Sequence, residues 1–199
     1  NFKEIQTLHD THRTKITHGK IDDDHVVFKR FRIVDENAIE RFENEANLLN
    51  VLSSSAHVLR PLGSIREPPI YGIMLPYFHF GSLGMILHAP GSKLKMSEGS
   101  NSSQFQISRK ARICAARDVL CAVAHCHEQE IIIRDIKPEN VFVSQDFVMV
   151  LADLELGISV ERSQQPLPEH RGGPASKPRL RFEGTPSYLA PEVIVAFLQ

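Results

Sequence analysis

Two charged residues stand where the surrounding pattern is apolar. Glu45 falls three residues after Phe42 and four before Leu49, inside the apolar stripe of a predicted helix. Lys29 shares one face of a predicted strand with Val27. A helix rotated towards solvent, or a lysine on an edge strand, would account for either residue taken alone. Because an unpaired buried charge is costly, we expect Lys29 and Glu45 to pair, with the ammonium available to phosphate oxygens.

A second candidate site is a polar loop held between two apolar runs. Residues 134–140 read Arg-Asp-Ile-Lys-Pro-Glu-Asn and lie between the apolar runs 131–133 and 141–143. Apolar flanks anchor both ends of such a loop, which is how a scaffold fixes catalytic groups. This loop and the end of the next predicted strand supply three oxygen-bearing side chains that could meet around a hard cation such as Mg²⁺: Asp135, Asn140 and Asp153.

The elements that must position these residues change in kind along the chain. The first part contains one helix, which begins after an N-cap at Asp35, and five predicted strands at 4–8, 15–19, 25–31, 58–65 and 70–75. The second part contains a helix at 107–130, a tight hairpin of 141–143 and 147–151, and a new helix from 191. Surface loops are predicted at 89–103 and 159–181. This order predicts two lobes with a ligand cleft between them.

The helix predicted at 107–130 has apolar residues three and four apart. Its expected buried stripe is Ile113, Ala116, Leu120, Val123 and His127. We expect His127 to be a packed core residue, because no cysteine or carboxylate set at zinc spacing accompanies the histidines. Three cysteines also lie on this helix: Cys114, Cys121 and Cys126. An odd, clustered set makes a poor disulfide framework and favours a reducing, intracellular compartment.

Composition narrows the class of partner. The chain has 199 residues, 42% of them hydrophobic, and a net charge of −1, which is ordinary for one globular domain or two small lobes. We therefore expect neither nucleic acid nor a membrane surface as a partner. No apolar run is long enough for a membrane span. The oligomeric state is left open.

Together these motifs resemble the protein kinase family, in its serine/threonine branch. Val26-Val27-Phe28-Lys29 resembles the family's strand with its lysine, residues 134–140 its catalytic loop, and residues 184–192 (Gly-Thr-Pro-Ser-Tyr-Leu-Ala-Pro-Glu) the end of its activation segment. The resemblance runs from about Glu4 to Val195. It implies an α+β, bilobal kinase-like fold, with a β-rich N-lobe at 1–76 and a partial, mainly helical C-lobe at 77–199.

The resemblance also implies roles for individual residues. In the family's pattern, Lys29 contacts the α- and β-phosphates of ATP and pairs with Glu45, while Asp135 is the catalytic base. Asn140 and Asp153 match the Mg²⁺ ligands. The remaining catalytic matches are Lys137, which supports the transferred phosphoryl group, and Thr185, which tethers the loop. The nucleotide-binding residues would be Lys29, Val27, Leu75, Pro76, Phe78 and Phe142, and a protein would be the phosphate acceptor.

The chain departs from the family's pattern at the phosphate-binding loop and at Glu155. No glycine stands in residues 9–15, so Arg13 or Lys15 would have to compensate for the missing close backbone approach. Glu155 replaces a glycine, which restricts the backbone, and its charge beside Asp153 either weakens metal binding or adds to it.

Further departures concern support and regulation. Ile133 and Leu154 replace a His and a Phe that pack together in the family, and we expect the two aliphatic side chains to repack. The activation segment has no Ser, Thr or Tyr between Lys177 and Gly184 to carry a phosphate for Arg134. Glu183 is a candidate to replace that phosphate with its own negative charge, and Ser176 is a weaker candidate phosphosite.

Two functions from different classes remain open at this point. One is an ATP-dependent serine/threonine protein kinase, for which the matched residues argue. The other is a pseudokinase acting as a binding or scaffolding module, for which the missing glycines and Glu155 argue. The chain starts at Asn1 and ends soon after Glu192, so we expect a fragment of a longer protein or a degraded gene product, with exposed apolar surface.

Overall fold

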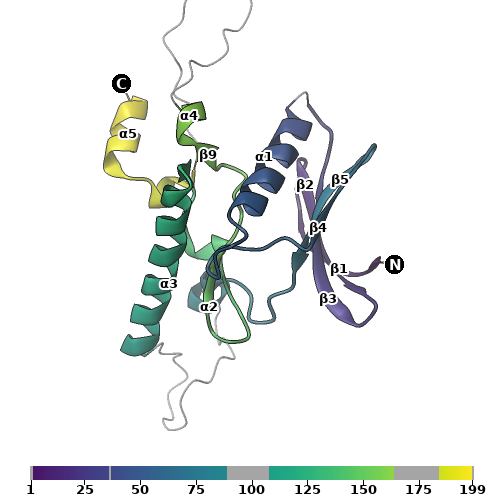
Figure 1. Ribbon diagram of the computed structural model, residues 1–199, viewed down its shortest axis with the longest axis horizontal. Helices are drawn as coiled ribbons and strands as arrows, with labels where there is room; N and C mark the ends of the chain where they lie inside the picture. The colour runs from purple at the N-terminus through teal and green to yellow at the C-terminus, as the bar shows by residue number, and fades with distance from the viewer. Residues whose placement is uncertain (1, 36, 89–107, 164–183, 199) are drawn as a thin grey trace, which may run out of the picture.

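The computed structural model describes residues 2–35, 37–88, 108–163 and 184–198. The loop predicted at 89–103 lies outside the described residues. So do most of 159–181 and the two candidates for a phosphate role, Ser176 and Glu183. In the described ranges a strand-rich part is followed by a mainly helical part, as the sequence predicts (Figure 1).

An antiparallel sheet forms the N-terminal part of the chain. Its strands are β1 (Phe2–Asp10), β2 (Thr14–Ile21), β3 (Asp24–Phe31), β4 (Gly63–Glu67) and β5 (Ile70–Pro76), in the spatial order β1-β2-β3-β5-β4. Lys29 pairs with Ile16 of β2 and with Ile73 of β5, so it lies in a strand with neighbours on both sides. The alternative of an edge-strand lysine is therefore wrong.

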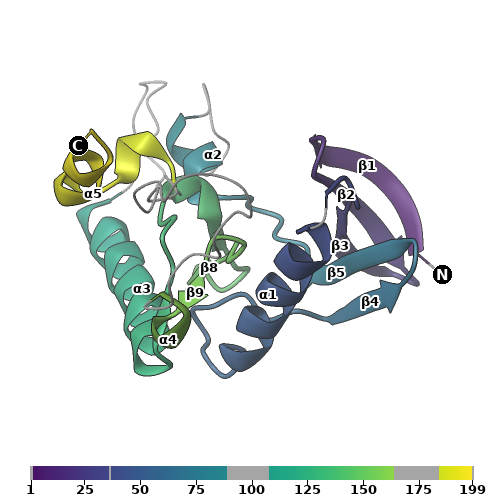
Figure 2. The same ribbon diagram turned by 90° about the horizontal axis from the view of Figure 1, so that it is seen from above.

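A single helix, α1 (Ala38–Val51), lies beside this sheet, between it and the helical part (Figure 2). Its N-cap is Asn37 and not Asp35 as predicted, because the Asp35 carboxylate accepts the backbone N–H of Asn37 at 2.9 Å, one turn before the helix begins. The predicted apolar stripe of Ala38, Phe42, Leu49 and Leu52 is buried, and Ala46 is buried beside it. Glu45 is only 1% exposed within it, so the helix is not rotated towards solvent.

The second part combines helices with two short two-stranded sheets. Its elements are α2 (Leu83–His88), α3 (Arg109–Glu128), β6 (Ile131–Ile132), the 3₁₀ turn η1 (Pro138–Asn140), β7 (Val141–Val143), β8 (Met149–Leu151), β9 (Ile158–Ser159), α4 (Val160–Ser163), the 3₁₀ turn η2 (Pro186–Tyr188) and α5 (Pro191–Leu198). β7 pairs with β8, and β6 with β9, both antiparallel. The predicted hairpin is confirmed, although β8 starts at Met149 because Phe147 adopts a positive φ of 59° in the turn.

The segment after α1 joins the two parts through backbone hydrogen bonds. Residues 58–62 were predicted to begin a strand of the N-terminal sheet, but Val58 forms a parallel bridge with Leu151 of β8 instead. The N–H of Leu151 donates to the carbonyl of His57, and the N–H of Leu59 donates to the carbonyl of Leu151, both at 2.8 Å. Pro61, which has no N–H, separates this pairing from β4.

The buried face of α3 is not the one predicted. Ile113 and Leu120 are 59% and 67% exposed, Ala116 and His127 are exposed as well, and Val123 is half-buried. The buried residues of α3 are Asp118, Ala122 and Cys126. The buried face of α3 is the one whose side chains can approach β8 closely and hydrogen-bond to it. Asp118 accepts the N–H of Met149 at 3.2 Å, and the small Ala122 and Cys126 permit close packing.

One cluster of buried apolar side chains runs through both parts of the described chain. It includes Phe42 and Leu49 of α1, Val143 of β7, Leu151 of β8 and Leu154. The expected boundary at residues 76/77 is therefore crossed by a shared core, and the division into two lobes stays a prediction. Among the described residues, no helix has both the length and the apolar character needed to cross a membrane.

Candidate active site

Lys29 and Glu45 form a buried ion pair, as the sequence predicts. The ammonium of Lys29 donates to both carboxylate oxygens of Glu45, at 2.9 and 2.7 Å, and the two side chains are 7% and 2% exposed. The central position of β3 and the buried stripe of α1 bring the two residues together. Each charge therefore has the partner that its burial requires.

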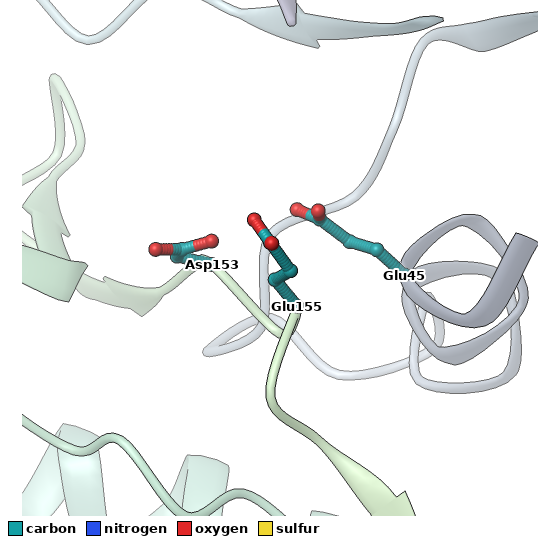
Figure 3. Close-up of side chains that lie close together, drawn as sticks. All are labelled: Glu45, Asp153 and Glu155. Carbon is teal, nitrogen blue, oxygen red and sulfur yellow. The ribbon is translucent and has the colours of Figure 1, made fainter. Parts of the chain in front are cut away.

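Two more carboxylates reach the same lysine from the segment after β8. Asp153 Oδ1 lies 2.9 Å from Lys29 Nζ and Glu155 Oε2 lies 3.5 Å from it. Figure 3 shows the carboxylates of Glu45, Asp153 and Glu155 converging from the helix and from this segment. One carboxylate oxygen from each of the three residues lies within 4.8 Å of the other two.

Crowding of these charges changes the pKa of Lys29 and of Glu45. Burial would lower the pKa of Lys29, but the three carboxylates outweigh it and hold the pKa well above its ordinary value, so the lysine stays charged. Burial raises the pKa of Glu45 to about 7, with Lys29 opposing the rise and Asp153 and Glu155 adding to it. The lysine is thus a fixed cation in a site with excess negative charge.

A second cluster is centred on Asp135 in the polar loop. Asp135 Oδ1 accepts the backbone N–H of Thr185 at 2.9 Å and its hydroxyl at 2.7 Å. Asp135 Oδ2 accepts Lys137 Nζ at 2.7 Å and Asn140 Nδ2 at 3.2 Å. Lys137 Nζ also donates to Thr185 Oγ1 at 2.8 Å, which closes a triangle of three side chains.

The surroundings keep Asp135 ionised. Burial alone would raise its pKa, but hydrogen bonds from Lys137 and Thr185 outweigh it and lower the pKa below the ordinary value. The side chain is nonetheless largely buried, with 8% of the residue exposed. Asp135 is therefore a preformed, charged acceptor with a fixed orientation.

The loop and the hairpin bring Asn140 and Asp153 to the same end of β7 and β8. The N–H of Ala152 donates to the carbonyl of Asn140 at 2.8 Å, which joins the residue before β7 to the residue after β8. Arg134 and Asp153 both adopt positive φ, at 68° and 57°. Such backbone angles persist only where the surrounding structure enforces them, and they are concentrated at functional sites.

These residues fit a hard divalent cation. The Nδ2 group of Asn140 donates to the carbonyl of Asp135 at 3.0 Å, and among the hydrogen bonds of the described residues its Oδ1 accepts none. That buried oxygen and the carboxylate of Asp153 are the kinds of ligand that Mg²⁺ prefers. Asn140 and Asp153 are therefore the side chains that would hold Mg²⁺.

The predicted nucleotide-binding residues gather around the connection between the two parts. Val27 pairs with Leu75 across β3 and β5, and the rings of Phe78 and Phe142 have centroids 5.4 Å apart. Pro76 and Phe78 also line a cavity of about 360 Å³, whose other walls are residues 53–56, 58–60 and Val150. Lys29 and Asp153 do not line that cavity, so it is distinct from the cluster of charges around Lys29.

The turn between β1 and β2, which stands where the family has its glycines, is closed by its own hydrogen bonds. The hydroxyl of Thr11 accepts the N–H of Arg13 at 3.3 Å and of Thr14 at 3.0 Å, while the N–H of Thr11 donates to the carbonyl of Thr14. Lys15, one expected substitute, pairs with Glu4 at 3.0 Å. The Thr-x-x-Thr spacing from 11 to 14 was the signal in the sequence, and sequence reasoning missed it.

The two aliphatic residues that were expected to repack beside the polar loop are both buried, as expected. Ile133 and Leu154 are 2% and 0% exposed and belong to the same buried cluster. Arg134 Nε donates to the carbonyl of Leu156 at 2.6 Å, so this arginine contacts the segment that carries Glu155. The sequence did not predict the contact between Glu155 and Lys29, because it depends on the backbone path after Asp153.

A β-sheet with one helix beside it, a buried Lys–Glu pair and a polar loop built on an aspartate define a fold of the protein-kinase type. Consistent with this, the family model for the protein kinase domain matches residues 14–197. The chain belongs to the protein kinase family.

Curated relatives are protein kinases of low identity. The chain is 37% identical over 135 residues to the serine/threonine-protein kinase sgk-1 of Caenorhabditis elegans, covering 67% of this chain and 26% of the relative. It is 28% identical over 164 residues to the dual specificity protein kinase shkB of Dictyostelium discoideum, covering 82% and 22%. For the LIM domain kinase 1 of Drosophila melanogaster the identity is 27% over 152 residues, covering 76% and 11%. The chain thus spans about a quarter or less of the length of these relatives.

Proposed function

We propose that this chain is the catalytic part of an intracellular serine/threonine protein kinase, which uses ATP and Mg²⁺ to phosphorylate hydroxyls of protein substrates. The observation that carries the proposal is the triangle of Asp135, Lys137 and Thr185, with distances of 2.7–2.8 Å between their side chains. The name of one relative described above, the serine/threonine-protein kinase sgk-1 of Caenorhabditis elegans, points the same way.

Five residues of the site have roles in this mechanism: Lys29, Asp135, Lys137, Asn140 and Asp153. A substrate hydroxyl takes over one of the acceptor positions on Asp135, which orients it in line with the phosphoryl group and receives its proton. Lys137, beside Asp135, stabilises charge on the transferred group. Lys29 binds phosphate oxygens, and Asn140 and Asp153 hold Mg²⁺. When bound, Mg²⁺ neutralises phosphate charge.

The decisive experiment is Asp135→Asn in the full chain. The amide keeps the shape of the side chain but cannot accept a proton, so phosphate transfer to serine and threonine peptides is expected to fall on the order of 10²–10⁴-fold. Asp146→Asn, in the exposed turn between β7 and β8, is the matched control and leaves transfer unchanged. Undiminished transfer by Asp135→Asn overturns the proposal.

A binding module without turnover is the second candidate, and two observations favour it. The N–H groups of Arg13 and Thr14 are engaged by Thr11, and Lys29 is engaged by three carboxylates. Both features disfavour phosphate binding. Calorimetry with ATP and Mg²⁺, followed by a turnover assay, separates the candidates: a module binds a protein partner without phosphorylating it, whereas a kinase shows Mg²⁺-dependent ATP binding and transfer.

A further inference from the structure

All three donors of the Lys29 ammonium are already used. They bond to Glu45 Oε1 at 2.9 Å, Glu45 Oε2 at 2.7 Å and Asp153 Oδ1 at 2.9 Å. An ammonium has three N–H donors and no acceptor, so a phosphate oxygen can bond to Lys29 only by displacing a carboxylate. Asp153 has a further role as a metal ligand in the proposed mechanism, and Glu45 is the structural partner of the lysine.

Glu155 adds a carboxylate that neither of these roles requires. Its Oε2 lies 3.5 Å from Lys29 Nζ, its side chain is 21% exposed, and that of the lysine is 7% exposed. In such a partly buried place, water screens charge less than it does at the surface. Glu155 therefore attracts Lys29 and repels any phosphate that approaches it.

The backbone holds Glu155 in this position. The positive φ of the segment belongs to Asp153, at 57°, and Glu155 adopts a negative φ, so the replacement of a glycine costs no left-handed strain here. Beyond it, the N–H of Gly157 donates to the carbonyl of Leu154 at 2.9 Å, and Asn44 Nδ2 donates to the carbonyl of Gly157 at 3.0 Å. The segment is thus fixed to α1, the helix that also carries Glu45.

A side chain at position 157 would be tightly placed. A Cβ there would lie 2.7 Å from Leu48 Cδ1 and 3.0 Å from the carbonyl oxygen of Leu154. This close approach sets how near the segment comes to α1, and so sets where Glu155 stands. The contact with Lys29 is a packed feature of the fold.

Several of the other donors in the β1–β2 turn are already engaged. The hydroxyl of Thr11 occupies the N–H groups of Arg13 and Thr14, and Glu4 pairs with Lys15. Phosphate binding therefore depends more heavily on Lys29 than it does where a glycine-rich turn leaves its amides open.

We propose that Glu155 is an internal competitor for Lys29, which lowers affinity for nucleoside triphosphates and makes their binding depend on a divalent cation. The proposal rests on the proposed function in that the ligand is ATP. The opposite role, in which Glu155 joins Asp153 as a metal ligand, predicts an effect of opposite sign. The two roles are therefore separable by measurement.

The experiment is calorimetric titration of the full chain with a non-hydrolysable ATP analogue, with and without Mg²⁺. Glu155→Gln keeps the shape of the side chain and removes its charge, and Glu155→Gly restores the family's residue. Both are expected to bind on the order of tenfold more tightly than the wild type, with the larger ratio in the absence of Mg²⁺. Glu67→Gln, at the exposed end of β4, removes the same charge away from the site and leaves the dissociation constant unchanged.

Two results overturn the proposal. An unchanged dissociation constant in Glu155→Gln shows that the carboxylate does not compete, and a weaker one shows that it binds the metal. Thermal melting checks that each variant is folded. If Glu155→Gly does not fold, the dissociation constant of Glu155→Gln alone decides the test. Turnover is measured separately. A chain that binds the analogue but phosphorylates no serine or threonine peptide overturns the proposed function and leaves the role of Glu155 standing.

Discussion

The side-chain amide of Asn44 bonds to the backbone carbonyl of Gly157, 3.0 Å away, and so ties α1 to the segment after Asp153. Replacing Asn44 with alanine leaves that carbonyl without this donor and loosens the contact between the Lys29–Glu45 pair and Asp153. We expect the free energy of unfolding to fall by about 1 kcal/mol and nucleotide affinity to change with it. Urea unfolding and calorimetry measure the two effects.

Asn50, exposed on the same helix, provides the control for that substitution. Asn50→Ala removes the same amide from α1 without touching Gly157. If the two variants lose equal stability, the bond between Asn44 and Gly157 contributes nothing specific.

Thr185 offers a test of the triangle around Asp135. Thr185→Ala removes the hydroxyl that donates to Asp135 and accepts from Lys137, so the lysine loses one of its two partners. We expect kcat to fall about tenfold, with KM for ATP little changed, because positioning in the transition state is affected more than nucleotide binding. Thr185→Ser retains the hydroxyl and should restore most of kcat. Equal losses in both variants would contradict a role for the hydroxyl.

Asp118 should give the stability of the chain an acid-sensitive component. Burial tends to raise its pKa, but the hydrogen bonds from Arg117 and the N–H of Met149 outweigh it and lower the pKa below the ordinary value. The ionised group therefore stabilises the fold fully above pH ~4, and this contribution is lost as the pH falls further, through the folded-state pKa.

The corresponding variant is Asp118→Asn. It should cost about 1–2 kcal/mol at pH 7, and the difference from the wild type should shrink below pH ~4. Urea unfolding across pH 2–8 measures it, with the exposed Asp146→Asn as control. A difference that is independent of pH would show that the charge of Asp118 contributes no stability.

The β1–β2 turn can be opened by a single substitution. Thr11→Ala removes the hydroxyl that accepts the N–H groups of Arg13 and Thr14. We expect stability to fall by ~0.5–1 kcal/mol and affinity for an ATP analogue to rise several-fold, because two amides become available to phosphate. Thr7→Ala, whose hydroxyl bonds to Glu4 further along β1, is the matched control. Unchanged affinity in Thr11→Ala would mean that the turn does not limit binding.

The orientation of α3 predicts which of its residues tolerate change. Leu120 is 67% exposed and Ala122 is fully buried. Leu120→Ser is expected to change the free energy of unfolding of this chain by less than ~0.5 kcal/mol, whereas Ala122→Leu overpacks the contact with β8 and costs ~1–3 kcal/mol. If chemical denaturation shows a larger loss of stability for Leu120→Ser than for Ala122→Leu, the buried face of α3 is the one predicted from the sequence.

That face shows where sequence reasoning has its limit. Ile113 and Leu120 satisfy the helical spacing as well as Ala122 and Cys126 do, so periodicity cannot decide which side meets β8. The side chosen contains Asp118, which the pattern treats as polar and therefore outward, and its backbone partner Met149 is thirty-one residues away in the chain.

The charged pair was predictable for the converse reason. Glu45 interrupts an apolar stripe and Lys29 lies in an apolar strand, and burial of either requires the other. The polar loop was predictable because its apolar flanks and its spacing are specific. The approach of Glu155 to Lys29 was not, since it depends on the φ of Asp153 and on the fit of Gly157 against Leu48.

The pairing of residues 57–59 with Leu151 determines how the molecule can bend. Because the C-terminal end of α1 leads directly into this pairing, that end is held to the β7–β8 hairpin while the N-terminal end, at Ala38, is not. A helix of this length spans about 21 Å. Asn44, midway along the helix, is a second attachment, because its amide bonds to the carbonyl of Gly157. Rotation of α1 about its C-terminal end would have to break that bond, so the two attachments together limit how far the helix can draw the carboxylate of Glu45 away from Lys29.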